Sequence, residues 1–371
     1  MKKIILFGIG NNGRVIVEAY EKYSPYFKII AIADNNAKLV EFHGIKVILP
    51  KEIKDYEYDE IWISTIYYEE ITNQLLEKLK INSSKIRYVE YPMLFLEQQI
   101  YDKYREELAG VKKCQTDEKQ QIIDYIIQNG VKMYCYSFYD EYMEKDVPVY
   151  LDDKNGMYYG IFLSHKMYLS RKLDTLEKAK NYFRYTFMEQ DIRSPHCYLT
   201  EAFQIKEGEV GIDIGAAEGV FALSVLDKVK HIYMIEADEN WCEALNMTFQ
   251  DFKEKVTIIK AYVSNQDCAN QIKLDTEFYD KKVDFIKMDI EGAEQSALIG
   301  AEHLIERNSP KLAICTYHHS EDNQVIGEWL QDKGYNTKNS NGYVICQGEW
   351  ELQDRNQVDF RRALLWAERE K

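Results

Sequence analysis

The chain has 371 residues, 46% of them apolar and 29% charged, which is the balance of a globular protein of two or three domains. The net charge of −15 argues against a nucleic-acid partner, because phosphate binding needs clustered lysines and arginines. The seven cysteines form no C-x-x-C pair and no apolar stretch reaches spanning length, so we expect a cytoplasmic protein without a disulfide framework, structural zinc site or membrane span.

Residues 1–92 alternate strand and helix patterns. Buried strands are predicted at 3–9, 28–34 and 60–66, and helices at 12–23 and 69–80. A compact alternation of this kind is typical of a small parallel sheet covered by helices. We therefore expect a Rossmann-like accessory domain over these residues.

The turn after the first strand carries a full G-x-G-x-x-G pattern. Gly8, Gly10 and Gly13 lie between strand and helix, and Asp34 ends the second strand, as in a nucleotide site. This module resembles the small nucleotide-binding domain at the front of several bacterial sugar-modifying enzymes. Three interpretations stay open: a site for a nucleotide or nucleotide-sugar, an NAD-dependent oxidoreductase, or a scaffold that forms a homodimer. The oxidoreductase is the weakest, because the segment lacks a Tyr-x-x-x-Lys pair.

Residues 93–170 have a different pattern. Amphipathic helices are predicted at 96–111 and 117–131, and a hairpin at 147–163 with its turn at 152–156. We interpret this region as a mainly helical connector or cap.

Residues 171–371 return to the alternating pattern. Five strands are predicted at 209–215, 231–238, 256–264, 283–290 and 311–318, and a sixth at 342–348. Helical patterns at 219–229, 240–252 and 294–306 separate most of them. The predicted fold class is therefore α/β, with two doubly wound Rossmann-like sheets joined by the connector.

The turn after the strand at 209–215 differs from the N-terminal turn. Asp213 stands where a dinucleotide fingerprint has its first glycine, Gly215 and Gly219 follow, and Glu218 lies at the helix start. Two carboxylates at this place would repel a pyrophosphate. They suit a ligand with positive charge and no phosphate, and S-adenosylmethionine, with its sulfonium and ammonium groups, is such a ligand.

The ends of the following strands complete a candidate donor site. Glu236 ends the second strand, where a carboxylate accepts hydrogen bonds from a ribose diol. Residues 262–264 end the third strand and would border the adenine. Asp289 and Glu291 follow the fourth strand, beside the same crevice.

Across residues 190–371 the chain resembles the FkbM-type S-adenosylmethionine-dependent methyltransferases. The resemblance is carried by "VGIDIGAAEGVFALSVL", "IYMIEAD", the Leu245–Asn246 pair, "IKLD" and "DFIKMDIEGAEQSALIGAE". Ala217 and Ala237 depart from the usual residues of the first two motifs. With the residues above, it implies the donor-binding set Asp213, Gly215, Ala216, Glu218, Gly219, Glu236, Ala237, Tyr262, Val263, Ser264, Asp289 and Glu291.

This resemblance also implies a class I methyltransferase fold and methyl transfer to a hydroxyl of a sugar, polysaccharide or glycoconjugate precursor. The alternative is a nucleotide-sugar-sensing or scaffolding protein whose methyltransferase half is degenerate. The intact set of Asp213, Gly215, Gly219, Glu236 and Asp289 argues against that alternative.

Transfer to a hydroxyl needs a group that takes its proton. His318 ends the fifth strand and is the first candidate, His196 is the second, and Asp289 is the third. Asp289, Glu291 and His318 also offer ligands for a divalent metal. We favour instead a role for the two acids in orienting the donor's ammonium, and the metal stays open. Arg361 and Arg362 would reach an acidic acceptor or, more simply, form a solvated basic face.

Overall fold

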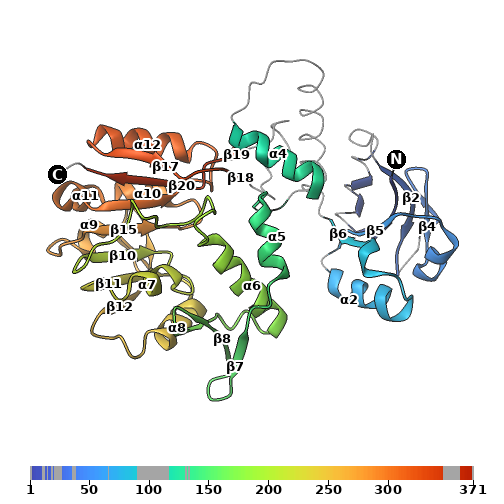
Figure 1. Ribbon diagram of the computed structural model, residues 1–371, viewed down its shortest axis with the longest axis horizontal. Coiled ribbons are helices and arrows are strands. Elements are labelled where there is room, and N and C mark those ends of the chain that lie inside the picture. The colour runs from blue at the N-terminus through green and yellow to red at the C-terminus, as the bar shows by residue number, and fades with distance from the viewer. Residues whose placement is uncertain are drawn as a thin grey trace. The chain divides into compact units, whose positions relative to one another are not determined.

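The computed structural model describes residues 2–89 except 11, 12, 15, 18, 19, 21–26, 36–38 and 66, residues 117–345 except 130, 131 and 133, and residues 360–369. The chain divides into two compact units (Figure 1). The first unit contains the described residues up to 89, and the second contains 134–345 and 360–369. The helix α4 (Asp117–Asn129) is divided between them. The helix predicted at 96–111 and the boundary at 92 lie outside the described residues.

The first unit is built on one sheet with the strand order β3-β4-β2-β1-β5-β6. All neighbours pair in parallel except β3 and β4. The described residues between 13 and 20 are helical, as the sequence predicts. The elements are β1 (Lys2–Phe7), β2 (Phe27–Ala33), β3 (Glu41–Phe42), β4 (Ile45–Ile48), the 3₁₀ helix η1 (Pro50–Asp55), β5 (Glu60–Ile63), α2 (Tyr68–Asn73), the π-helix η2 (Gln74–Lys78), the 3₁₀ helix η3 (Ser83–Lys85) and β6 (Ile86–Tyr88).

The second unit is built on a mixed sheet with the order β12-β11-β10-β15-β16-β20-β17. The first five strands are parallel and the last two are antiparallel to their neighbours. Its strands are β10 (Val210–Ile214), β11 (His231–Glu236), β12 (Val256–Lys260), β15 (Phe285–Met288), β16 (Lys311–Cys315), β17 (Asn336–Asn339) and β20 (Leu364–Glu368).

Helices pack on both faces of this sheet because its strands are apolar on both sides. One core joins Phe221 of α7 (Val220–Val225) and Leu245 of α8 (Glu239–Thr248) to the sheet. The second core joins the sheet to α10 (Glu294–Ile299), α11 (Glu302–Asn308) and α12 (Asp322–Asp332). The strand order reverses between β10 and β15, so the crevice at their carboxyl ends is where such a sheet binds a ligand.

The segment before the large sheet packs on the same core. β7 (Val149–Asp152), β8 (Met157–Phe162) and β9 (His165–Tyr168) form an antiparallel sheet, which confirms the predicted hairpin and adds a third strand. Side chains of β7 and β9, and of α6 (Leu176–Glu189), share a core cluster with α7. The other elements are α5 (Ser137–Glu144), α9 (Leu274–Glu277), the pair β13 (Tyr262–Val263) and β14 (Gln271–Ile272), and the pair β18 (Val344–Ile345) and β19 (Phe360–Arg361).

The sixth predicted strand of the large sheet is wrong. Among the described residues β18 pairs with β19, outside that sheet, and β17 and β20 take the two antiparallel places instead. The apolar run "YVIC" resembles a buried strand in the sequence, but the place beside β16 is taken by β20. Within the described ranges, no helix combines the length and the apolar character needed to cross a bilayer.

Candidate active site

A cavity of about 530 Å³ opens at the carboxyl ends of the central strands of the second unit. It lies where the strand order reverses, as the topology leads one to expect. Most of the predicted site residues line it: His196, Gly215, Ala216, Glu218, Glu236, Ala237, Tyr262, Val263, Asp289 and Glu291.

The turn after β10 needs glycine at two positions. Gly215 has φ +72°, and a β-carbon there would lie 1.8 Å from the carbonyl oxygen of Asp289. Gly219 has φ +85°, and its β-carbon would lie 2.7 Å from the ring of Phe249 and 2.9 Å from Leu245. The first glycine therefore brings the turn against the end of β15, and the second lets α7 start close to α8.

Glu236 is held at the cavity wall by two backbone groups. Its Oε2 accepts a hydrogen bond from the backbone N–H of Ala217 at 2.9 Å, and its Oε1 accepts one from Asp238 at 2.8 Å. Each carboxylate oxygen has a second lone pair. The carboxylate is thus fixed in orientation and able to accept two further hydrogen bonds.

Asp213 lies behind the cavity and not in its wall. It is fully buried, and its Oδ1 lies 3.0 Å from Nζ of Lys287 on the adjacent strand. The Lys287 amine also donates to the Gly215 carbonyl at 2.7 Å. Burial opposes the charge on Lys287, but Asp213 and Asp289 raise the pKa of its amine, which stays charged. This ion pair anchors the turn from beneath.

Replacing Asp213 by alanine is expected to lower the free energy of unfolding by about 3–5 kcal/mol, because it strands the Lys287 charge in the core. Urea unfolding of the full chain measures this loss. Asp174→Ala, which breaks an exposed pair with Lys178, is the control and should leave stability nearly unchanged. Equal stability of the two variants would show that the buried pair does not anchor the turn.

Glu218 is a buried carboxyl group in the cavity wall. The hydroxyl of Tyr182 donates a hydrogen bond to its Oε2 at 2.6 Å. Burial raises the pKa of Glu218 to about 7, although the Tyr182 hydrogen bond lowers it. A cationic ligand beside this group would favour its ionised form, so the carboxyl can lose its proton when a positive charge binds in the cavity.

Asp289 is the centre of a polar cluster at the inner end of the cavity. The Tyr198 hydroxyl donates to its Oδ2 at 2.7 Å, and Nε2 of His196 lies 3.5 Å from the same oxygen. Nε2 of His318 lies 3.6 Å from Oδ1 on the other side. Burial would raise the pKa of Asp289, but the positive charges of His196, Lys287 and His318 hold it well below its usual range.

In His196 and His318, burial and the neighbouring carboxylates shift the pKa in opposite directions. Burial lowers their pKa values, but for His196 the charges of Asp289 and Glu189, and for His318 those of Glu294 and Asp289, raise them above 6.5. Nδ1 of His318 lies 2.9 Å from Oε1 of Glu294, which also accepts from the backbone of Ile290. His318 is therefore oriented by a buried carboxylate at one nitrogen, as a general base requires.

Some predicted residues lie outside the cavity wall, namely Asp213, Gly219, Ser264 and His318. The hydroxyl of Ser264 bonds instead to Gln271 at 2.9 Å. Of the predicted metal ligands, Asp289 and His318 lie together, but the third member of their cluster is Glu294 and not Glu291. The Glu291 side chain is 91% exposed, and its Oε2 lies 3.7 Å from His318.

Neither C-terminal arginine faces this cavity. Arg361 is buried and donates to the carbonyls of Tyr317 at 2.7 Å and His318 at 2.6 Å, so the predicted solvated basic face is wrong for this residue. Arg362 donates to Glu118 at 2.9 Å. The guanidinium of Arg361 is occupied by hydrogen bonds to the backbone carbonyls after β16. It is therefore not available to bind an acidic acceptor.

The sequence analysis did not predict that residues of α6 form one wall of the cavity. Tyr182, Tyr185 and Glu189 lie three and four residues apart, on one helix face, and all line the cavity. The other unpredicted lining residues include Tyr198, Trp241 and Tyr317. The spacing on α6 is a signal in the sequence, but it does not tell this face from an ordinary core face.

The first unit has its own cavity, of about 620 Å³, lined by Gly8, Gly10 and Asp34 among others. Gly8 has φ +102°, and the backbone N–H of Ile9 donates to Oδ2 of Asp34 at 2.9 Å. Gly13 lies beneath the turn, where a β-carbon would be 2.0 Å from the Gly8 carbonyl oxygen. The structure thus brings the four predicted residues together around one turn.

The comparisons with known proteins bear on both units. Residues 269–337 match the model of the methyltransferase FkbM domain. This confirms for that segment, which includes Asp289, Glu294 and His318, the family resemblance that the motifs indicated. Residues 1–87 match the model named C2185-like, N-terminal. No curated protein matches the chain.

Several solved structures are similar to this chain. One is the methyltransferase FkbM from Methylobacillus flagellatus KT, with 16% identity, a TM-score of 0.42, and coverage of 99% of this chain and 90% of the other. A precorrin-6y C5,15-methyltransferase from Geobacter metallireducens GS-15 has 13% identity, a TM-score of 0.32, and coverage of 45% and 83%. TrmK from M. capricolum, in complex with S-adenosyl-homocysteine, has 12% identity, a TM-score of 0.29, and coverage of 46% and 67%.

Proposed function

We propose that the second unit is an S-adenosylmethionine-dependent O-methyltransferase. The observation that carries this proposal is the carboxylate of Glu236, fixed by Ala217 and Asp238 at the end of β11 and facing the cavity. An acid in this place fits the ribose diol of a nucleoside ligand. The match of residues 269–337 to a methyltransferase domain supports the same reaction.

The residues present fit this donor. Gly215 lines the cavity in the turn after β10, Glu236 would hold the ribose, and Tyr262 and Val263 would border the adenine. Glu218, Asp289 and Glu291 give the wall negative charge, which suits a sulfonium and an ammonium group. When bound, the donor supplies a methyl group on positively charged sulfur.

His318 is the group we assign to the acceptor's proton. Its Nδ1 is held by Glu294, and its Nε2 lies behind the cavity wall, 3.6 Å from Asp289 and 3.7 Å from Glu291, which both line the cavity. His196 and Asp289 are the other two candidates from the same cluster. Removing the proton as the methyl group arrives makes the hydroxyl oxygen a better nucleophile.

The acceptor we propose is a hydroxyl of a sugar, polysaccharide or glycoconjugate precursor. Tyr182, Tyr185, Trp241 and Tyr317 give the cavity an aromatic wall with polar edges. Flat amphipathic rings of this kind can cover the apolar face of a sugar while their polar atoms bond its hydroxyls.

For the first unit we propose a Rossmann-like site for a nucleotide or nucleotide-sugar. The observation that favours it is the cavity formed by Gly8, Gly10 and Asp34, with the Asp34 carboxylate fixed by the backbone of Ile9. Such a site would present or sense the sugar on which the second unit acts.

A thermal-shift panel tests both sites in the full chain. S-adenosylhomocysteine at 100 times its Kd should stabilise the chain by about 2.7 kcal/mol, which raises the unfolding temperature. UDP-sugars and NAD test the first unit in parallel. A shift with UDP-sugars or NAD but none with S-adenosylhomocysteine would remove the methyltransferase proposal and favour the sensing or scaffolding alternative.

A further inference from the structure

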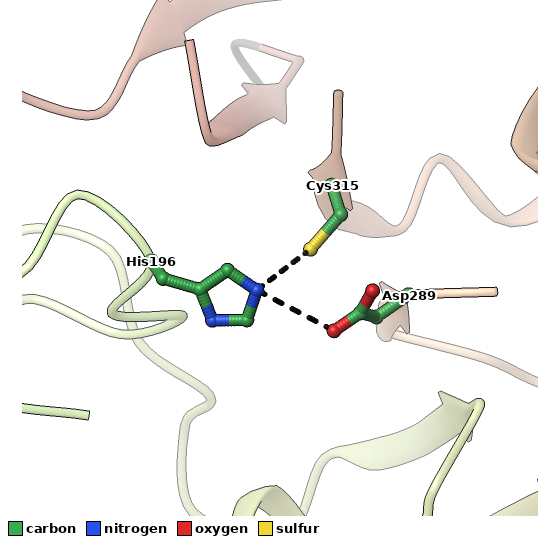
Figure 2. A group of neighbouring side chains, drawn as sticks. All are labelled: His196, Asp289 and Cys315. Carbon is green, nitrogen blue, oxygen red and sulfur yellow. Dashed lines mark hydrogen bonds and ion pairs between the residues drawn. The ribbon is translucent and has the colours of Figure 1, made fainter. Parts of the chain in front are cut away.

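Cys315, at the end of β16, converges with His196 and Asp289 (Figure 2). Nε2 of His196 lies 3.5 Å from Sγ of Cys315 and 3.5 Å from Oδ2 of Asp289. The N···O distance exceeds the ~2.7–3.2 Å of a direct N–H···O hydrogen bond. His196 thus contacts Cys315 through a long hydrogen bond and Asp289 through an ion pair, and the three ligand atoms lie together at one point.

Their spacing fits shared coordination of one ion. Zinc binds cysteine sulfur at about 2.3 Å and histidine nitrogen or carboxylate oxygen at about 2.0–2.2 Å, so neighbouring ligand atoms around a tetrahedral ion lie about 3.3–3.6 Å apart. Both distances from His196 are 3.5 Å, and the ligand atoms of all three residues lie within 4.8 Å of one another.

The charges also match a divalent ion. A thiolate from Cys315 and the carboxylate of Asp289 neutralise two positive charges, and His196 adds a neutral ligand. Tyr198 donates to Oδ2 of Asp289 at 2.7 Å and so orients this ligand from outside the cluster. The nearby positive charge of Lys287 is already paired with Asp213. Burial raises the pKa of the Cys315 thiol, so an ion must displace the proton when it binds.

The cluster also has the open side of a catalytic metal site. His196 and Asp289 line the cavity, whereas Cys315 is fully buried beneath them. A fourth ligand would therefore come from the cavity, and catalytic zinc sites keep their fourth position for water or substrate.

We propose that His196, Asp289 and Cys315 bind one Zn²⁺ or a similar transition-metal ion whose fourth position faces the cavity. Metal binding here stands independently of methyl transfer. Its role rests on the proposed function: the ion would bind the acceptor hydroxyl and lower its pKa, and His318 would take the proton while His196 remains a ligand.

The test uses Co²⁺, which replaces Zn²⁺ in such sites and gives a thiolate-to-metal charge-transfer absorption. Titration of the metal-stripped full chain should produce this band, saturating near about one ion per chain, and Zn²⁺ should abolish it. Cys315→Ser should remove the band. Cys242→Ser is the matched control, because Cys242 is also buried but its thiol bonds to the Glu236 carbonyl at 3.3 Å.

A second set of variants guards against misfolding. His196→Ala should weaken Co²⁺ affinity at least tenfold, whereas His318→Ala should leave the band unchanged, with folding checked by circular dichroism. A wild-type chain without the band, or a band that persists in folded Cys315→Ser, overturns the metal site. Because this readout needs neither donor nor acceptor, a chain that binds S-adenosylhomocysteine but no Co²⁺ refutes the metal site alone.

Discussion

Glu236→Ala is expected to weaken the binding of S-adenosylhomocysteine by about 10- to 100-fold. A hydrogen bond to a charged group contributes about 1.5–3 kcal/mol, and each 1.4 kcal/mol changes Kd tenfold. The carboxylate is held in place by Ala217 and Asp238, so its orientation is set before the ligand arrives. Isothermal titration calorimetry measures the change.

Two further variants test whether the loss of affinity is specific to the Glu236 carboxylate. Glu239→Ala removes a largely exposed carboxylate three residues along the chain and should leave affinity unchanged. Glu236→Gln retains an acceptor for one backbone N–H and should fall between wild type and alanine. If Glu236→Ala binds the ligand as tightly as wild type, the ribose assignment is wrong.

His318→Ala is expected to lower kcat by about 100- to 10,000-fold, which is the usual contribution of a general base, with little change in donor affinity. The donor contacts we assign come from β13 and from the ends of β10, β11 and β15, whereas His318 follows β16 and lies outside the cavity wall. The ratio of the effects on kcat and on Kd for S-adenosylhomocysteine is the measurement. His303→Ala, which removes an exposed histidine, is the control.

The pH profile gives a second readout for the same residue. A base acts only when it is unprotonated, and Glu294 with Asp289 raises the pKa of His318 above 6.5 despite its burial. Wild-type turnover should therefore rise with pH through that raised pKa and fall as pH drops below it. His318→Ala should flatten this acid limb. Wild-type turnover in the variant would transfer the role to Asp289 or His196.

The part of the cavity wall that we assign to the donor was predictable because it depends on local spacing. Gly215, Glu218 and Glu236 come from strand ends and the turns that follow, and parallel strands bring these ends to one edge. The inner end was not predictable in the same way. Tyr198 and Asp289 are 91 residues apart, and His196 and Cys315 are 119 apart, so only the folded chain brings them together.

Asp213 shows that an acidic residue at a strand end does not by itself indicate a ligand-binding residue. In the register of β10 against β15 it lies directly beside Lys287, and both side chains point into the same buried layer. Strand register, which composition and spacing do not encode, gives Asp213 a partner inside the protein.

The contact between the turn after β10 and the end of β15 limits how this site can be altered. Because a side chain at residue 215 would collide with the Asp289 carbonyl, glycine there lets the turn that we assign to the donor lie directly against the end of β15. We expect related chains with other acceptors to keep this contact and to differ on the cavity-facing side of α6.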